Sequence, residues 1–389
     1  MTPQEIENIS YPIEQIYERM TDELLLNIAK HLNSPTWTWT ALREIETLGT
    51  MGQLTEENIK IINKYVQMIP EDVKKAMNDS RLIALQEIEE KLKKAAANGF
   101  LVEPVTDSTV EITKAFSDQA LSQLNLVNQT MLDSSLQAYQ NGVHELRQGM
   151  RSITNLADLG FSQSEIDLAA GQTIEGTETR ISALRKTLRR LNQNGITGFV
   201  DKAGRSWSAE AYVNMDIRTT VHNTYIQSIK SRQEDYGSDV FQVSSHAGAR
   251  PLCYPYQGKL YSWSQMGGFI TLGDGKRYKF ESISATSYGK PAGLFGINCG
   301  HVPYPMIPGV SEKVDEKIPP KKENDKEYEE SQEQRSLERK IRYYKREIQM
   351  LGNLATDEDR QKLKNAQADM RQFIADTGRT RRYDREQIV

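Results

Sequence analysis

The chain has 389 residues, of which 38% are hydrophobic and 26% are charged, and its formal net charge is −4. This length allows two or three domains. The acidic balance excludes a global basic field that would draw the protein onto nucleic acid, so any DNA contact has to be local. The mean hydropathy of −0.62 favours long solvated helices with narrow apolar stripes over one thick core.

The cysteine content and the distribution of apolar residues limit the cellular compartment. Two cysteines in the whole chain exclude a disulfide framework. The N-terminus lacks the charged and apolar regions of a secretory signal. No apolar run approaches the ~20 residues that span a bilayer. We therefore expect a protein that is made in a reducing cytoplasm and has no membrane contact.

Residues 1–176 are predicted to be a helical region, because apolar residues recur there at helical spacing. Ser34-Pro35 predicts the start of a helix, and Gly49–Gly52 predicts a break before a cap at Thr55. The longest helix is expected from Asp107 or Ser108 to about Met150. Its exposed positions carry Gln, Asn and Ser, which favours packing beside other protein about as much as an ordinary solvated face.

The composition changes near Gly176, and residues 177–308 are predicted to form a compact, Gly-rich α+β module. A short basic helix, a β-hairpin over GFVDKAGRSWS and a helix from Ala209 to Tyr236 come first. The periodicity then changes from 3.6 to 2, which predicts strands over FQVSS, GKLYSW, FITL and RYKFESIS. The Asp274-Gly275 pair predicts a turn between the last two strands.

Residues 309–330 are charged and contain proline, which predicts a linker. Residues 331–389 are predicted to be a helical hairpin with a tail. Gly352-Asn353 begins its turn, Thr356 or Asp357 caps its second helix, and Gly378 ends that helix. The predicted fold class is therefore mainly α with a small α+β domain.

Two basic segments are the candidates for a local DNA contact. One is the helix with Arg180–Arg190, for which a solvated face is favoured over a phosphate-contact strip because the chain is acidic. The other is the tail at Arg379–Arg385, which we expect to be frayed. Nonspecific DNA binding through either segment is one hypothesis.

Four residues of types that bind metals lie in the stretch 244–304: His246, Cys253, Cys299 and His301. Two thiolates and two imidazoles would satisfy tetrahedral zinc, although the spacing departs from common zinc patterns. The alternative is two buried thiols and two hydrogen-bonded imidazoles in a small core. A Cys253–Cys299 disulfide is disfavoured in a reducing compartment. A further alternative is a nucleophile–base pair of Cys299 with His301 or His246, which would make the protein a cysteine-dependent or zinc-dependent hydrolase.

The order of motifs in residues 180–305 resembles the Mu F-like group of tailed-phage minor capsid proteins, and most closely its phage minor capsid protein 2 branch. An Arg-Thr helix precedes a strand, a D/H-x-x-x-R-x-x-C segment, a Gly-Lys strand and a terminal Cys-x-His element. The matching residues outside the Cys/His set are Arg218, Thr219, Arg250, Gly258 and Lys259. Many relatives carry additional cysteines that would complete a metal-binding set, and this chain lacks them.

The resemblance implies a structural role and no enzymatic activity. Members of the group are low-copy head proteins of phages or prophages that associate with the portal protein and with other head proteins. They travel in the virion, in the capsid interior near the portal, after assembly in the host cytoplasm. They affect DNA packaging or ejection.

Overall fold

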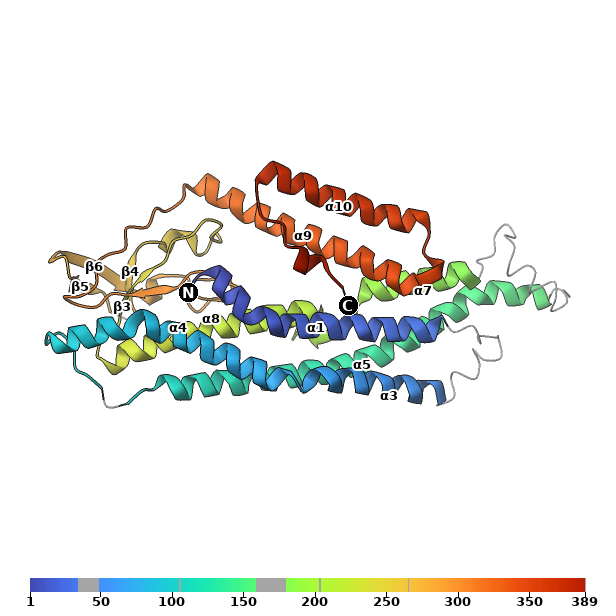
Figure 1. Ribbon diagram of the computed structural model, residues 1–389, viewed down its shortest axis with the longest axis horizontal. Coiled ribbons are helices and arrows are strands. Elements are labelled where there is room, and N and C mark those ends of the chain that lie inside the picture. Colours follow the sequence, from blue (N-terminus) through green and yellow to red (C-terminus); the bar gives the residue numbers. More distant parts are fainter. Residues whose placement is uncertain (34–48, 105, 159–179, 203, 265, 389) are drawn as a thin grey trace. The chain divides into compact units, whose positions relative to one another are not determined.

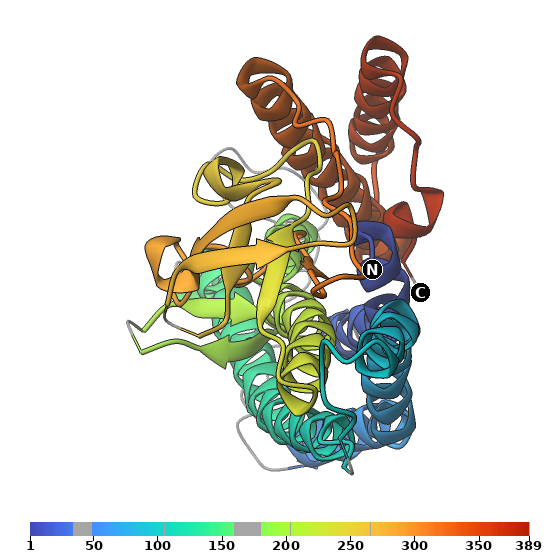
Figure 2. The ribbon, with the colours of Figure 1, turned by 90° about the vertical axis from the view of Figure 1, so that its left-hand side faces the viewer.

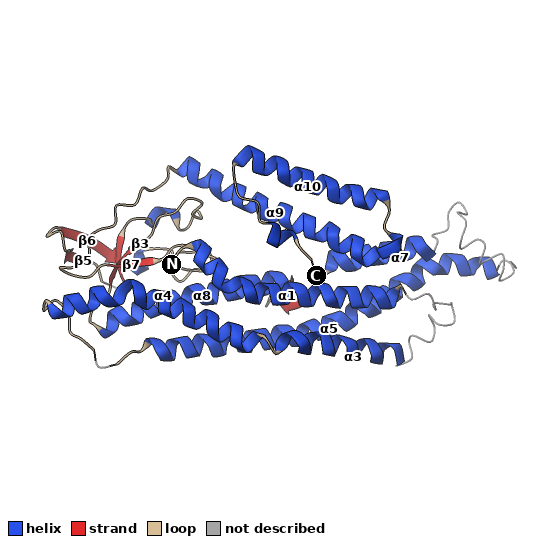
Figure 3. Cartoon of the chain, viewed as in Figure 1, coloured by secondary structure: helices blue, strands red, loops and turns tan. Residues whose placement is uncertain are grey.

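The structure is a computed structural model that describes residues 1–33, 49–104, 106–158, 180–202, 204–264 and 266–388. The predicted helix start at Ser34-Pro35 lies outside the described residues. Helices dominate the described chain, and strands occur in a small part of it (Figure 3). The predicted fold class, mainly α with a small α+β part, is confirmed.

The chain forms two compact units, each built from three stretches of sequence. Unit 1 comprises Met1–Gln15, Met68–Leu124 and Val213–Glu333, and unit 2 comprises Ile16–Gln67, Asn125–Tyr212 and Gln334–Val389. Segments far apart in the sequence therefore share a core in both units. The predicted domain limits at residues 176, 308 and 330 stay a prediction.

The described helices before residue 177 agree with the predicted helical region. They are α1 (Pro3–Leu32), α3 (Gly49–Val66), α4 (Ile69–Ala97) and α5 (Thr109–Asp158). Helix α7 (Arg180–Asn194) agrees with the short basic helix predicted at the start of the α+β module. The predicted break at Gly49–Gly52 is wrong, because α3 begins at Gly49. A single glycine inside a helix costs only about 1 kcal/mol, so the surrounding helix continues through Gly52. Helix α5 begins as predicted, and Asp107 Oδ1 accepts a 3.0 Å hydrogen bond from the Thr109 amide.

The strands form a hairpin in unit 2 and a five-stranded sheet in unit 1. The hairpin pairs β1 (Thr197–Val200) with β2 (Ser206–Ser208), as predicted. The sheet has the order β5-β6-β4-β3-β7. Its strands are β3 (Val240–Val243), β4 (Leu260–Ser262), β5 (Gly268–Thr271), β6 (Arg277–Ser282) and β7 (Pro303–Pro305). Strands β3, β4, β5 and β6 are labelled in Figure 1.

Four of the five strands were predicted, and β7 was missed. Two of its three residues are proline, which lacks the amide hydrogen that a central strand donates. Proline is tolerated at the edge of a sheet, and β7 is an edge strand that pairs only with β3. The position in the sheet, rather than the local sequence, therefore makes this segment a strand.

Helix α8 (Ala209–Asp235) is the central element of unit 1 and lies beside the sheet (Figure 2). Toward α4, the Ser80 hydroxyl donates a 2.7 Å hydrogen bond to the carbonyl of Val221. Toward the sheet, the Gln233 amide donates to the carbonyl of Val240 at 2.9 Å and accepts from the Trp263 indole at 3.2 Å. The helix is therefore bound on more than one side.

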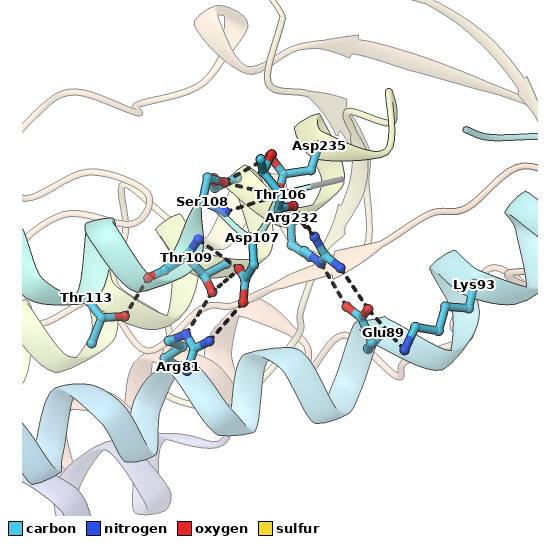
Figure 4. A network of polar contacts seen from close by, with 11 residues as sticks. Arg81, Glu89, Lys93, Thr106, Asp107, Ser108, Thr109, Thr113, Arg232 and Asp235 are labelled. Carbon is cyan, nitrogen blue, oxygen red and sulfur yellow. Dashed lines mark hydrogen bonds and ion pairs between the residues drawn. The ribbon is translucent and has the colours of Figure 1, made fainter. Parts of the chain in front are cut away.

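A polar network connects α4, α8 and the segment that leads into α5 (Figure 4). The guanidinium of Arg232 donates two hydrogen bonds of 2.9 Å to Glu89 and one of 3.0 Å to the carbonyl of Thr106. Arg81 pairs with Asp107 at 2.9 Å. Because a planar guanidinium binds a carboxylate through two parallel bonds, Arg232 fixes the direction of α8 against α4.

The C-terminal hairpin is confirmed as α9 (Lys321–Leu351) and α10 (Asp357–Thr377). Thr356 and Asp359 form a reciprocal capping box at the start of α10, and Gly378 ends it in the left-handed conformation. Helix α9 begins within the predicted linker, ten residues before the expected start. Two prolines lie directly before α9, where proline favours the start of a helix. Lys321 also pairs with Asp325 one turn later, which stabilises the first turn.

A chain of buried amides in unit 2 links three helices. Asn58 on α3 is fully buried and accepts a 2.9 Å hydrogen bond from Asn27 on α1. It donates a bond of the same length to the hydroxyl of Ser135 on α5. Since Asn58 is shielded from water, its amide depends on Asn27 and Ser135 for these hydrogen bonds.

We predict that Asn58→Ala lowers the free energy of unfolding of unit 2 by about 2 kcal/mol, because it removes a fully buried amide that bonds to Asn27 on α1 and to Ser135 on α5. Urea unfolding followed by far-UV circular dichroism measures the change. Asn63→Ala, at an exposed position of the same helix, is the control and should cost less than about 0.5 kcal/mol. Equal effects of the two substitutions would contradict the prediction.

Candidate metal centre

Two loops of unit 1 bring the cysteines together. Cys253 precedes the short helix η1 (Tyr254–Tyr256) in the segment after β3, and Cys299 lies in the segment before β7. The two segments are joined at Ser244, whose amide donates to the carbonyl of Val302 at 3.0 Å and whose hydroxyl accepts from the Val302 amide at 2.9 Å. The predicted compact site therefore forms from residues about fifty positions apart.

The second loop has an unusual backbone before Cys299. Phe295 and Asn298 have φ of 58° and 54°, in the left-handed region that residues other than glycine seldom adopt. The amide of Phe295 donates to Cys299 Sγ at 3.3 Å, and the amide of Asn298 donates to the Thr219 hydroxyl at 3.3 Å. The strained backbone is thus held by bonds that aim an amide hydrogen at the sulfur.

Three of the four predicted ligands converge. The distance from Cys253 Sγ to Cys299 Sγ is 3.9 Å, and the distance from Cys299 Sγ to His301 Nδ1 is 3.5 Å. All three atoms lie within 4.8 Å of one another. Tetrahedral zinc with usual bond lengths separates two sulfur ligands by about 3.8 Å and a sulfur from a nitrogen by about 3.6 Å. The two distances from Cys299 Sγ therefore fit a zinc ion.

The fourth predicted ligand, His246, lies beside this set but outside it. Its ring centroid is 4.3 Å from that of His301. Its Nδ1 lies 2.9 Å from the carbonyl of Ala247 and donates to it, which leaves a lone pair on Nε2. That Nε2 is buried and has no hydrogen-bond partner among the described residues. A ring whose second nitrogen is held by a carbonyl is the usual arrangement of a metal-binding histidine.

His222 is a further histidine at the site, and the sequence analysis missed it. It is 1% exposed on α8, and its Nε2 donates to the carbonyl of His301 at 2.7 Å. The sequence signal that could have pointed to His222 is its position one helical turn after Arg218, a residue of the motif set. A contact between residues 79 positions apart, however, cannot be inferred from spacing.

The remaining motif residues support the two loops. Arg218 pairs with Glu7 at 3.8 Å, and the carbonyl of Arg250 accepts from the amides of Cys253 and Tyr254 at 2.8 and 2.9 Å. Gly258 has φ of 71°, and the carbonyl of Lys259 accepts from the amide of Val243 at 3.0 Å. The motif residues therefore shape the backbone around the cysteines.

The hydrogen bond between the two thiols shifts their pKa values in opposite directions. The bond from Cys253 holds the pKa of Cys299 below the usual value of a thiol, and the adjacent His301 acts in the same direction. The same bond, together with burial, raises the pKa of Cys253. Burial lowers the pKa of His222 and that of His246. Both imidazoles are therefore favoured in the neutral form, which is the form that binds metals.

Helix α8 also carries a carboxyl group that burial holds partly protonated. Burial raises the pKa of Asp216 to about 6. Its Oδ2 atom is buried and has no hydrogen-bond partner among the described residues. Ionising this group inside the protein therefore costs free energy.

Arginines of the basic helix α7 form ion pairs within unit 2. Arg185 pairs with Asp359 at 3.0 Å, and Arg189 pairs with Glu347 at 3.0 Å. Asp359 is 2% exposed, so these contacts join α7 to the hairpin α9–α10. These two arginines serve internal ion pairs, which argues against the phosphate-contact strip at Arg180–Arg190.

Comparisons with known proteins identify the class. The family described as Phage minor capsid protein 2 matches residues 1–157 and 160–375. The chain therefore belongs to this family of phage structural proteins. It is 28% identical over 350 residues to the "Structural protein" of Lactococcus phage LL-H. The matched region covers 88% of this chain and 87% of that protein. No solved structure matches.

The family assignment confirms the resemblance to the phage minor capsid protein 2 branch deduced from residues 180–305, and extends it over nearly the whole chain. In the parts of the chain that the structure describes, none of the helices combines the length and the apolar character that a membrane span requires.

We predict that Asp216→Asn abolishes a pH dependence of stability. The pKa in the folded protein, about 6, exceeds the value of 3.8 expected after unfolding, so the wild-type protein binds this proton more tightly when folded. Its stability should then fall as the pH rises from about 4 to about 6, by on the order of 2–3 kcal/mol. Urea unfolding of both proteins across this range measures the difference.

The variant should equal the wild type near pH 4 and exceed it near pH 7.5. Asp118→Asn, at an exposed position of α5, is the control and should follow the wild-type profile. A constant difference between Asp216→Asn and the wild type at all pH values would contradict the prediction.

Proposed function

We propose that this protein is a minor component of the phage head that binds the portal protein and other head proteins, and acts in head assembly and in DNA packaging or ejection. It would lie in the capsid interior near the portal and pass through the host cytoplasm before assembly. The family match over nearly the whole chain carries this proposal. The family match alone supports a structural role in the phage. Binding to the portal, the position in the capsid and the step in packaging are our proposal.

The surface of α5 supports a partner of protein nature. Between Gln119 and Asn141 its exposed side chains are almost all uncharged, and they include Leu126, which is 52% exposed. Asp133 is the one acidic residue in this exposed series. A helix face without charge can be covered by another protein at a small desolvation cost.

We expect the protein to form a complex with the portal protein of the same phage. Co-expression followed by size-exclusion chromatography with light scattering should give a single species that contains both chains. Co-expression with the portal protein of an unrelated phage is the control and should give separate species. Separate elution of the two folded cognate proteins would contradict the proposal.

The alternative, an enzyme centred on the cysteines and histidines, is less well supported. Cys299 and His301 are close enough for a nucleophile–base pair. However, Cys253, Cys299 and His301 are at most 5% exposed, so a substrate would have to displace protein to reach them. Burial of this kind is usual for a structural centre.

We further propose that Cys253, Cys299 and His301 hold a structural zinc ion, with His246 as the fourth ligand. The support is the match of the two measured distances to a tetrahedron and the unpartnered Nε2 of His246. When bound, zinc would crosslink the two loops. The loops are otherwise joined by hydrogen bonds, so the metal would add to the stability of unit 1.

We predict that protein purified without chelator contains one zinc per chain. Cys299→Ala and His301→Ala should lose the metal, His246→Ala should weaken its binding by about 10-fold or more, and a strong chelator should lower the thermal midpoint. His144→Ala, at an exposed position of α5, is the control. Metal-free wild-type protein whose thermal midpoint does not change when zinc is added would refute the site and leave the portal proposal intact.

A further inference from the structure

The C-terminal part of unit 2 is basic in an acidic protein. Residues 334–389 contain fourteen Lys and Arg against nine Asp and Glu, whereas the whole chain has 49 basic and 53 acidic residues. This segment includes most of α9, all of α10 and the tail. A charge asymmetry of this kind is typical of a local contact with a polyanion.

The tail comes after α10 in the sequence and lies along α9 in the structure, so the expectation of a frayed tail is wrong. Gln334 donates to the carbonyl of Thr380 at 2.9 Å, and Arg385 pairs with Glu338 at 3.7 Å. Further along α9, Lys345 donates to Gln387 at 3.0 Å. Contacts spread over about three turns of α9 therefore hold the tail, including its short helix η4 (Tyr383–Glu386).

Glu338 is the centre around which the basic groups gather. It is buried, and four guanidinium groups act on its charge: those of Arg335, Arg342, Arg382 and Arg385. Other carboxylates share part of this charge, since Arg342 also pairs with Glu18 and Arg382 pairs with Asp384 at 3.2 Å. The docked tail nevertheless adds Arg382 and Arg385 to the basic residues of α9, so that basic residues outnumber acidic ones in this part of unit 2.

Part of this charge faces solvent. Arg339 and Lys340 are exposed on α9. The ring of Tyr383 is 62% exposed, and the guanidinium of Arg381 lies 4.6 Å from its centroid. Arg381 also makes two 2.7 Å hydrogen bonds to Glu386. These contacts use the charge of Arg381 inside the tail, so the solvent-facing positive charge comes from Arg339, Lys340 and Arg382.

We propose that the surface formed by α9 and the tail, residues 335–345 and 379–385, binds the phosphate backbone of double-stranded DNA. Guanidinium groups suit phosphate because their planar donors match its oxygens. A contact with the backbone alone is independent of sequence, as a head protein that meets any part of a genome would need. The proposal deepens the proposed function by naming the DNA-contacting surface, and its test uses no portal protein.

The test measures binding of the full-length protein to a labelled 30-base-pair duplex by fluorescence anisotropy at increasing NaCl concentration. We expect binding at 50 mM NaCl and a linear fall of log K against log salt concentration. A triple variant, Arg339→Gln, Lys340→Gln and Arg382→Gln, should bind at least 10-fold more weakly. Its salt slope should be smaller by about 2 to 3, since each phosphate contact contributes about 0.9.

The matched control removes the same charge from exposed positions of unit 1: Lys74→Gln, Lys75→Gln and Lys114→Gln. This variant should lose less than threefold in affinity, and circular dichroism should show that both triple variants are folded. Three outcomes would overturn the proposal: no binding of DNA at 50 mM NaCl, an equal loss in the two triple variants, or tighter binding of poly-glutamate than of DNA. The last would indicate an acidic protein as the partner.

Discussion

The burial of α8 is the constraint on which unit 1 depends. Its side chains bind α4 through Arg232 and Glu89, the sheet through Gln233, and the cysteine-bearing loop through His222 and Thr219. A buried polar group that loses its partner costs about 1–3 kcal/mol, and more if it is charged. A shift of α8 would break several of these contacts at once. These contacts therefore fix the position of the helix, and the helix in turn fixes the position of the cysteine-bearing loop that it contacts.

Unit 2 uses ion pairs for the same purpose. Arg346 on α9 pairs with Asp22 on α1 and with Glu210 at the start of α8. Arg189 on α7 pairs with Glu347 on α9. Breaking one partner of a buried pair is costly because the other charge stays buried. The arginines of this unit thus have two roles: Arg189 and Arg346 join the hairpin to α7 and α1, and those of the tail pair with Glu338, Asp384 and Glu386.

The cysteine–histidine cluster and the family assignment agree on a structural role. The cluster joins two loops of a module whose order of motifs marks the family, and its members are buried. A zinc ion there would stabilise the module without taking part in a reaction. A basic surface on the C-terminal hairpin would give the same protein a contact with the genome. Both features are therefore consistent with the structural role of the family.

The sequence by itself determined the local elements. Apolar periodicity, caps and turn residues predicted the helices, four strands of the sheet and the hairpin α9–α10, because these features act over a few residues. Only the tertiary structure decided that Pro303–Pro305 is an edge strand, that His222 joins the cluster, and that His246 lies beside the three converging donors. It also decided that α7 binds Asp359 while the tail lies along α9. These outcomes depend on contacts between distant segments, and no local spacing encodes which segments pack together.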